Sequence, residues 1–210
     1  MRMVSKTPHV SIQSGMMKAF GVMCCGQGIS GMTIRRILSI ENPEDLPILR
    51  QVCAPVSLSK KELESLIEDM FETMHEVDGV GLAAPQIGIN QRLVVIHIPA
   101  RHEKKRDGSM VEIEAEQNYA MLDPVITHRS ETTVTGSEGC LSLPGRYAPI
   151  KRTSWVTCEY RDIKGRNLRI RRATGLLARA IQHEIDHLDG VLFIDHVTDL
   201  STIEDVRNQK

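Results

Sequence analysis

The clearest hydrophobic pattern in the chain follows Ser59. The run Ser59-Lys60-Lys61-Glu62 has the S-x-x-E spacing of a capping box, in which serine and glutamate satisfy backbone N–H groups at the start of a helix. Apolar side chains then recur every three or four residues, at Leu63, Leu66, Ile67, Met70, Phe71, Met74 and Val77. This spacing places them on one face, so it predicts an amphipathic helix of about five turns. We expect Gly79 to end this helix in a left-handed conformation.

Shorter apolar runs bounded by turn-forming residues predict β-strands. These runs are Arg92–Ile98, Tyr119–Ile126, Trp155–Tyr160 and Leu168–Arg171. The segment Asp162–Gly165 separates the last two strands and predicts a hairpin turn. Residues 101–116 are highly charged and contain the turn signal Asp107-Gly108, so we expect a solvated connection there.

A second apolar helix is predicted near the C-terminus. Thr174 can cap its start, the helical pattern continues to Leu188, and Gly190 is placed to close it. Together these elements predict an α+β fold, in which small antiparallel β-sheets pack around this buried second helix. The amphipathic helix after Ser59 is the N-terminal helix of that fold.

Composition narrows the possible classes of protein. A chain of 210 residues predicts one domain. A helix needs about 20 apolar residues to cross a bilayer, and no apolar run in the chain is close to that length. The net charge of −1 argues against direct binding of nucleic acid through a basic surface. The 5 cysteines are an odd number without regular spacing, which favours a reducing compartment.

Residues 1–31 differ in composition from the rest of the chain. They contain no Asp or Glu, and their only basic side chains are Arg2, Lys6 and Lys18. We interpret them as an N-terminal extension, either disordered or a targeting segment. Residues 32–210 are then expected to form a single domain.

The second helix carries His183-Glu184-Ile185-Asp186-His187, an H-E-x-x-H motif. Residues four apart lie on one helix face, so His183 and His187 can grip a single metal ion. Glu184 lies close enough to act as a general base on a water molecule bound to that ion. The alternative is a solvated helix end that happens to carry two histidines.

A catalytic metal site needs a third protein ligand and an open coordination position. Cys140 is the best candidate, because it lies between strand-like segments. Glu204, near the C-terminus, is a weaker one. The ordinary interpretation of a single cysteine is a small buried hydrophobe.

Three separated motifs together resemble those of peptide deformylases. Gly79–Gln86 (GVGLAAPQ) is similar to the family's G-x-G-x-A-A-x-Q, Glu138–Ser142 matches its E-G-C-L-S, and Gln182–His187 matches its Q-H-E-x-D-H. The resemblance extends from about Ile34 to Val197 and keeps the order of the motifs. It implies a metallohydrolase that removes the formyl group from the N-terminal formylmethionine of new polypeptides.

The resemblance also implies a role for individual residues. Cys140, His183 and His187 would hold the metal ion, and a metal-activated hydroxide would attack the formyl carbon. Glu184 would act as general acid and base, taking the proton of water and delivering it to the leaving amine. The side-chain amide of Gln86 and the backbone N–H of Leu141 would stabilise the charge on the formyl oxygen.

Substrate-binding residues follow from the same resemblance and from helical spacing. Val80 and Gly81 would lie against the substrate, and Leu176 would help to line an apolar pocket for the methionine side chain. Arg146 and Arg152 are candidates for contacting the peptide backbone, although a surface charge is an equally good interpretation. The resemblance implies one divalent metal ion as cofactor, with Fe(II) as the expected native metal, and a Cys/His/His donor set also admits Zn(II) or another divalent metal.

The implied partners are N-formylmethionyl nascent peptides near the ribosome exit, with no membrane and no direct nucleic acid contact. The expected location is the cytoplasm of a bacterium, or a mitochondrion or plastid if residues 1–31 are a transit peptide. Two other functions stay open. An H-E-x-x-H metallopeptidase would cut internal peptide bonds, and a metal-stabilised binding module would have a closed site with four ligands.

Overall fold

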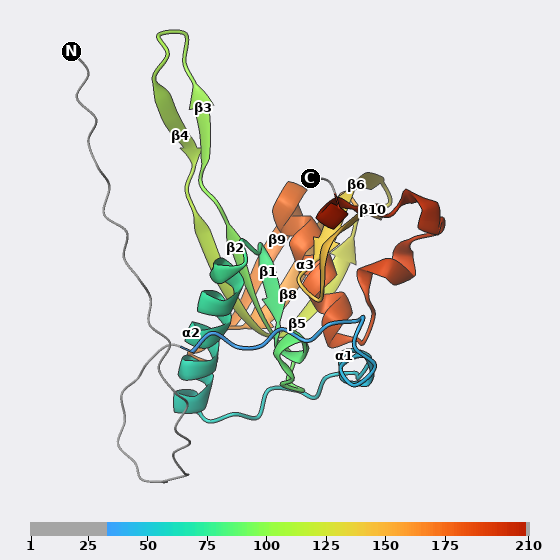
Figure 1. Cartoon of the computed structure of the whole chain (residues 1–210). Coiled ribbons are helices and arrows are strands. Elements are labelled where there is room, and N and C mark those ends of the chain that lie inside the picture. The colour runs from blue at the N-terminus through green and yellow to red at the C-terminus, as the bar shows by residue number, and fades with distance from the viewer. Residues whose placement is uncertain (1–32, 209–210) are drawn as a thin grey trace, which may run out of the picture. The chain divides into compact units, whose positions relative to one another are not determined.

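A central antiparallel sheet of five strands organises this computed structural model, with strand order β1-β2-β5-β8-β9 (Figure 1). The structure describes residues 33–208, so the extension expected over residues 1–31 lies outside the described part. The strands of this sheet are β1 Gly81–Ala83, β2 Leu93–Ile98, β5 Gln117–Arg129, β8 Trp155–Arg161 and β9 Asn167–Thr174. All four predicted strands are therefore confirmed, and the turn at Asp162–Gly165 joins β8 to β9.

Two helices cover opposite faces of this sheet. They are α2, Lys60–Glu76, and α3, Gly175–Leu188. Alternate residues of β2 separate the two faces, because Leu93 and Val95 pack with the apolar side chains of α2, whereas Val94 and Ile96 pack with those of α3. A strand that is buried on both faces is a continuous apolar run, as β2 is.

A second, three-stranded sheet has the order β10-β7-β6. Its strands are β6 Thr133–Cys140, β7 Leu143–Thr153 and the short β10 Glu204–Asp205. β6 and β7 are not predicted by the sequence, because Gly and Pro interrupt their apolar pattern and such residues are depleted in strands. The register of the β6–β7 pair shifts between Gly139 and Cys140. Such irregularities re-aim a side chain, and here the residue at the shift is Cys140.

The remaining elements are short and connect or flank the two sheets. They are α1 Leu46–Leu49 and the 3-10 turns η1 Ala84–Ile87, η2 Phe193–His196, η3 Leu200–Thr202 and η4 Val206–Asn208. Phe193 packs with Leu143, Ala148 and Ile150 and so forms a small core beneath the β6–β7 sheet.

The start of α2 has the capping box that the sequence predicts. Ser59 accepts a hydrogen bond from the backbone N–H of Glu62, and the Glu62 carboxylate accepts one from the backbone N–H of Ser59. The end of the helix differs from the prediction, because Asp78 and not Gly79 takes the left-handed conformation, with φ 53°. The Gly79 N–H then reaches back to the Met74 carbonyl at 2.9 Å, which is the closing bond of a Schellman motif.

The predicted end of α3 is confirmed, whereas the predicted side-chain cap at its start is wrong. Thr174 occupies the N-cap position, but its side chain makes no capping hydrogen bond, so the predicted side-chain cap is wrong. Gly190 does close the helix in a left-handed conformation, with φ 72°. A Cβ at Gly190 would lie 2.4 Å from the Arg50 carbonyl oxygen, so the position also requires the small size of glycine.

The charged stretch 101–116 forms a hairpin of two strands, β3 Arg101–Lys104 and β4 Met110–Glu114, that projects away from the two sheets (Figure 1). Nearly all of its residues are exposed, in agreement with the expected solvated connection, although the prediction did not include the strands.

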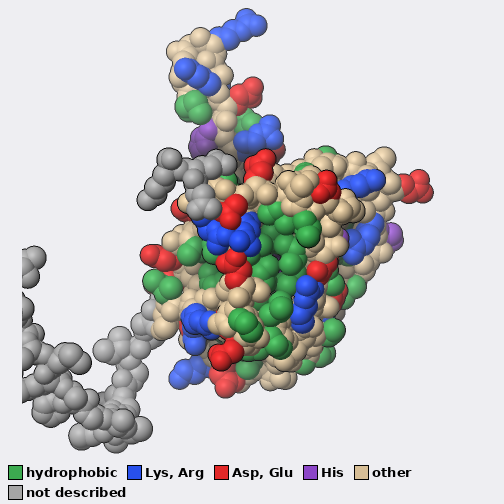
Figure 2. Space-filling view, turned by 45° about the vertical axis from the view of Figure 1, so that its right-hand side comes forward, with side chains coloured by type: hydrophobic (Ala, Val, Ile, Leu, Met, Phe, Trp, Pro, Cys, Tyr) green, Lys and Arg blue, Asp and Glu red, His purple; other side chains and the backbone are tan. Residues whose placement is uncertain are grey.

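The described residues thus have the small antiparallel sheets and few helices expected of an α+β fold. None of their helices has the length and apolar character needed to cross a membrane. Figure 2 shows that hydrophobic side chains gather near the middle of one face, with charged side chains around them.

Candidate active site

Three potential metal ligands converge between the second sheet and α3. Cys140 lies at the end of β6, and α3 contributes His183 and His187 one turn apart. One ligand atom from each lies within 4.8 Å of the others, and the Cys140 sulfur is 3.2 Å from Nε2 of His187. The structure therefore brings together the sulfur and the two imidazoles that the sequence places 43 or more positions apart.

The Cys140 thiol is distinct from the other described cysteines. Burial disfavours its thiolate, but the adjacent His187 and His183 imidazoles outweigh burial and hold the pKa of Cys140 well below its ordinary value. By contrast, burial without such partners raises the pKa of Cys53 to about 11 and that of Cys158 to about 12. Only the environment of Cys140, among these three, favours the thiolate that ligates metal.

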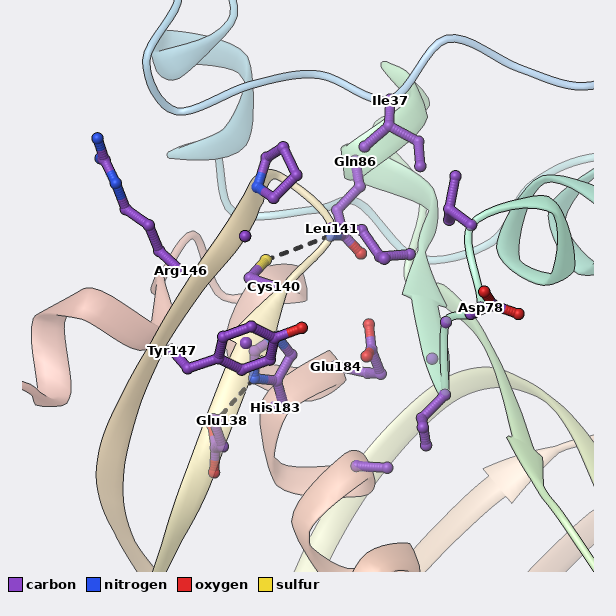
Figure 3. Close-up of a pocket in the computed structure, with 18 of the residues that line it drawn as sticks. Ile37, Asp78, Gln86, Glu138, Cys140, Leu141, Arg146, Tyr147, His183 and Glu184 are labelled. Carbon is purple, nitrogen blue, oxygen red and sulfur yellow. Dashed lines mark hydrogen bonds and ion pairs between the residues drawn. The ribbon is translucent and has the colours of Figure 1, made fainter. Parts of the chain in front are cut away.

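The carboxylate of Glu138 contacts the imidazole ring of His183. Its Oε2 lies 3.0 Å from Nδ1 of His183, which leaves the other ring nitrogen facing the cysteine (Figure 3). Burial raises the pKa of Glu138, but hydrogen bonds from His183 and Arg152 dominate and lower it far below its usual range. An ionised carboxylate that accepts the second N–H of a histidine fixes the tautomer and the orientation of the ring.

Arg152 is neither a substrate contact nor a surface charge, so both sequence interpretations of it are wrong. It is buried, and it donates through Nε and Nη2 to the two oxygens of Glu138, each at 2.9 Å. Its Nη1 donates to Asp186 of α3 at 2.5 Å. Arg152 therefore ties β6 and β7 to the helix that carries the histidines.

Glu184 is buried beside the three donors and has an unsatisfied oxygen. Burial raises its pKa to about 7, against the opposing effect of the His183 and His187 imidazoles. Its Oε2 has no hydrogen-bond partner among the described residues. A buried carboxylate oxygen without a partner is costly, unless a ligand or a water molecule satisfies it.

Gly81 provides the room for that carboxylate. A Cβ at Gly81 would lie 2.2 Å from Oε1 of Glu184 and 2.7 Å from its Cδ. The sequence predicts that Gly81 contacts the substrate. The structure adds a second physical requirement for glycine, since any side chain here would displace Glu184.

Gln86 is buried in η1 with a fixed amide orientation. Its Oε1 accepts the N–H of Ala83 at 2.8 Å, so Nε2 points toward the site. That Nε2 lies 3.2 Å from Oγ of Ser142 and 3.6 Å from the Cys140 sulfur. Leu141 lies next to Cys140 in the turn between β6 and β7, so both predicted oxyanion donors border the same space.

A cavity of about 560 Å³ opens beside these groups. The predicted substrate-binding residues Val80, Gly81 and Leu176 all line it. Arg146 also lines it, but its guanidinium is paired with Glu41 and Asp205. This cavity has the size of small-ligand sites in proteins.

Several contributors to the site were missed at the level of sequence. Glu138 and Ser142 belong to the E-G-C-L-S motif, which was the available signal, but nothing in the motif shows which side chains they hold. Arg179 of α3, to which the sequence assigns no role, donates to Glu138 at 2.6 Å. These are contacts between segments distant in the chain, which spacing along the sequence does not reveal.

An α+β scaffold with a cysteine, a histidine pair and a buried carboxylate around one cavity is the arrangement of a candidate hydrolytic metal site. Residues 34–202 match the model of the polypeptide deformylase family. A peptide deformylase of Roseiflexus sp. (strain RS-1) is 58% identical over 174 residues, which are 83% of this chain and 94% of that protein.

Solved structures agree with this match. A peptide deformylase of Synechococcus elongatus, in complex with actinonin, aligns with a TM-score of 0.66 and 37% identity over 80% of this chain and 83% of that one. The class I type b peptide deformylase of Acinetobacter baumannii with bound Met-Ala-Ser aligns with a TM-score of 0.66 and 30% identity over 80% of this chain and 100% of that one. The chain therefore belongs to the polypeptide deformylase family, and it is an enzyme of that family.

Replacing Arg152 by methionine is expected to destabilise the fold by about 3–5 kcal/mol, because Glu138 and Asp186 then lose the buried cation between them. Urea unfolding of the metal-free protein measures this loss. Arg166→Met is the matched control, since it breaks an exposed pair with Asp162 and should cost less than about 1 kcal/mol. Equal losses in the two variants would contradict a special role for the buried network.

Proposed function

We propose that this enzyme hydrolyses the formyl amide at the N-terminus of N-formylmethionyl peptides, with a divalent metal ion held by Cys140, His183 and His187. The observation that carries the proposal is the convergence of these three donors with the buried Glu184 carboxylate at one cavity. The products would be formate and a peptide with a free amino group, since water adds to the formyl carbon and the carbon–nitrogen bond breaks.

The residues present fit a divalent cation. One thiolate and two imidazoles are a donor set that suits Fe(II) and Zn(II), and they leave a coordination position free in a four-coordinate site. The 3.2 Å between the Cys140 sulfur and Nε2 of His187 is close to the about 3.5 Å that two such ligands of one tetrahedral ion would take. Fe(II) is the native metal we propose, with Zn(II) or another divalent metal as the alternative.

Glu184 is proposed as the general acid and base. A bound cation would supply Lewis-acid activation of water at this site. A carboxyl group with a pKa raised to about 7 is suited to accept a proton from the attacking water and to return it to the leaving amine. Its unpartnered Oε2 is the atom available for this transfer.

Gln86 and Leu141 are proposed to stabilise the negative charge that develops on the formyl oxygen. The Ala83 N–H holds the Gln86 amide so that its NH₂ group is presented beside Cys140. The backbone N–H of Leu141, in the adjoining turn, would be the second donor. Donors that are fixed in advance need no reorganisation when the charge appears.

The apolar part of the cavity is proposed to take the methionine side chain. Val80, Leu141, Leu176 and Ala180 line it, and all four have hydrocarbon side chains. Gly81 at the same wall would allow the peptide backbone to approach. The Acinetobacter baumannii relative was solved with the peptide Met-Ala-Ser, the sequence of a deformylated product, which supports this assignment.

We further propose residues 32–210 as the catalytic domain and nascent formylmethionyl chains, near the ribosome exit, as its partners. The setting would be bacterial cytoplasm, or an organelle if residues 1–31 act as a transit peptide.

Release of formate from formyl-Met-Ala-Ser, compared with release of acetate from acetyl-Met-Ala-Ser, tests the function. We expect turnover of the formyl peptide alone. The acetyl group has a methyl where the formyl group has a hydrogen, so it would need more room between the Gln86 amide and Glu184. Cleavage of an internal peptide bond without formate would support the metallopeptidase instead. Stoichiometric metal without any hydrolysis would support a binding module.

Glu184→Gln keeps the shape of the side chain but removes its capacity to carry the proton. We expect formate release to fall by about 10²–10⁴-fold, with the metal content unchanged because the three ligands remain. Turnover and elemental analysis on the same anaerobic sample check both points. A variant with normal turnover would remove Glu184 from the mechanism.

Gly81→Ala tests whether the position of the Glu184 carboxylate matters for turnover. Because the added Cβ would overlap the carboxylate, Glu184 must move, and we expect kcat to fall by about 10²-fold, the cost of a misplacement of about 1 Å. Gly165→Ala is the control: its φ of 75° disfavours alanine and should cost stability, but a Cβ in this β8–β9 turn meets nothing within 4 Å, so kcat should not change. An unchanged kcat in Gly81→Ala would show that the exact position of Glu184 is unimportant.

A further inference from the structure

Arg179 lies one helical turn before His183 on α3, and both side chains reach the same carboxylate. Nη1 of Arg179 donates to Oε1 of Glu138 at 2.6 Å, while Nδ1 of His183 lies 3.0 Å from Oε2. Residues four apart in a helix project from one face, so a single Glu138 side chain can bridge them. The Glu138 carboxylate is thereby held by two neighbours on the helix that carries the histidines.

The guanidinium of Arg179 is itself fixed by the second sheet. It donates to the backbone carbonyls of Ile150 at 3.1 Å, Val134 at 3.2 Å and Gly136 at 3.4 Å. Gly136 makes this position possible, because a Cβ there would lie 2.7 Å from Nη2 of Arg179. Arg179 is therefore a rigid donor, and its side chain is only 16% exposed.

Arg152 does not duplicate this contact. It approaches Glu138 from β7 and shares its charge with Asp186. Oε1 accepts from both Arg152 and Arg179, whereas Oε2 accepts from Arg152 and faces His183. Without Arg179, Oε1 of Glu138 would accept a hydrogen bond from Arg152 only. The Glu138 carboxylate would then be freer to rotate against the Arg152 guanidinium.

We propose that Arg179 is a positioning residue for the metal site: by fixing Glu138, it fixes the orientation of the His183 imidazole toward Cys140 and the cavity. This inference rests on the proposed function, since it assigns His183 to the metal ion. Arg179 would then affect metal affinity, although it is neither one of the three ligands nor a direct partner of one.

The competing role for Arg179 is direct contact with substrate, because it also lines the cavity. The two roles predict different measurements. A positioning role changes metal affinity and kcat, whereas a substrate contact changes KM and leaves metal affinity alone.

The experiment compares Arg179→Met with Arg179→Lys and with Gly136→Ala, which keeps the arginine but displaces its guanidinium. Arg171→Met is the matched control, because Arg171 is an exposed arginine of β9 without an ion pair in the described part of the chain. Zn²⁺ affinity is measured by competition with a chromophoric chelator, and kcat and KM are measured on formyl-Met-Ala-Ser. Thermal unfolding of each metal-free variant shows whether it is folded.

We expect Arg179→Met to weaken Zn²⁺ binding by about tenfold and to lower kcat, with KM changed by less than about twofold. Arg179→Lys should recover part of the Zn²⁺ affinity, because its ammonium group can still donate to Glu138. Gly136→Ala should show the same direction of change as Arg179→Met, and it decides the matter if Arg179→Met does not fold. Arg171→Met should behave like the unmodified protein.

Unchanged Zn²⁺ affinity in both Arg179→Met and Gly136→Ala would overturn the proposal, as would a raised KM at unchanged affinity. Equal affinities in Arg179→Lys and Arg179→Met would also overturn it, because donation to Glu138 would then be irrelevant. Failure of the proposed function has a different signature. The unmodified protein would release no formate, while the Zn²⁺ affinities would still report on Arg179.

Discussion

The buried carboxylate of Glu138 joins the second sheet, which carries Cys140, to α3, which carries His183 and His187. It accepts hydrogen bonds from Arg152 and Arg179 and lies within hydrogen-bond distance of Nδ1 of His183. A carboxylate in this setting would be strongly disfavoured without its cations, so the strands and the helix are stable only in the relative position that pairs them. The position of the Cys140 sulfur opposite the histidines follows from that alignment.

Packing around α3 supplies the rest of the alignment. Burial of Ile181, Ile185 and Leu188 against the five-stranded sheet leaves the histidine face of the helix directed at β6. The opposite face of the sheet is covered by α2, so the strand between the two helices is immobilised on both sides. Apolar burial thus places the helix, while the ion pairs at Glu138 set its orientation against the second sheet.

The site also depends on missing side chains. Gly81 leaves room for the Glu184 carboxylate, and Gly136 leaves room for the Arg179 guanidinium. In both cases a polar group occupies space that a Cβ would take. These glycines lack a positive φ, so their small size and not their backbone freedom is the physical requirement.

Local pattern in the sequence was sufficient for the helix after Ser59, for four of the five strands of the central sheet and for the spacing of His183 and His187 on one helix face, because these features depend on near neighbours in the chain. It was insufficient for β6 and β7, whose Gly and Pro residues weaken the strand signal, and for the helix end at Asp78. Only the tertiary structure decided that Arg152 is buried against Glu138, that Gln86 presents its NH₂ group to Cys140, and that Gly81 borders Glu184. Those contacts join segments far apart in sequence, and the balance of burial and pairing that selects them exists only once the chain is folded.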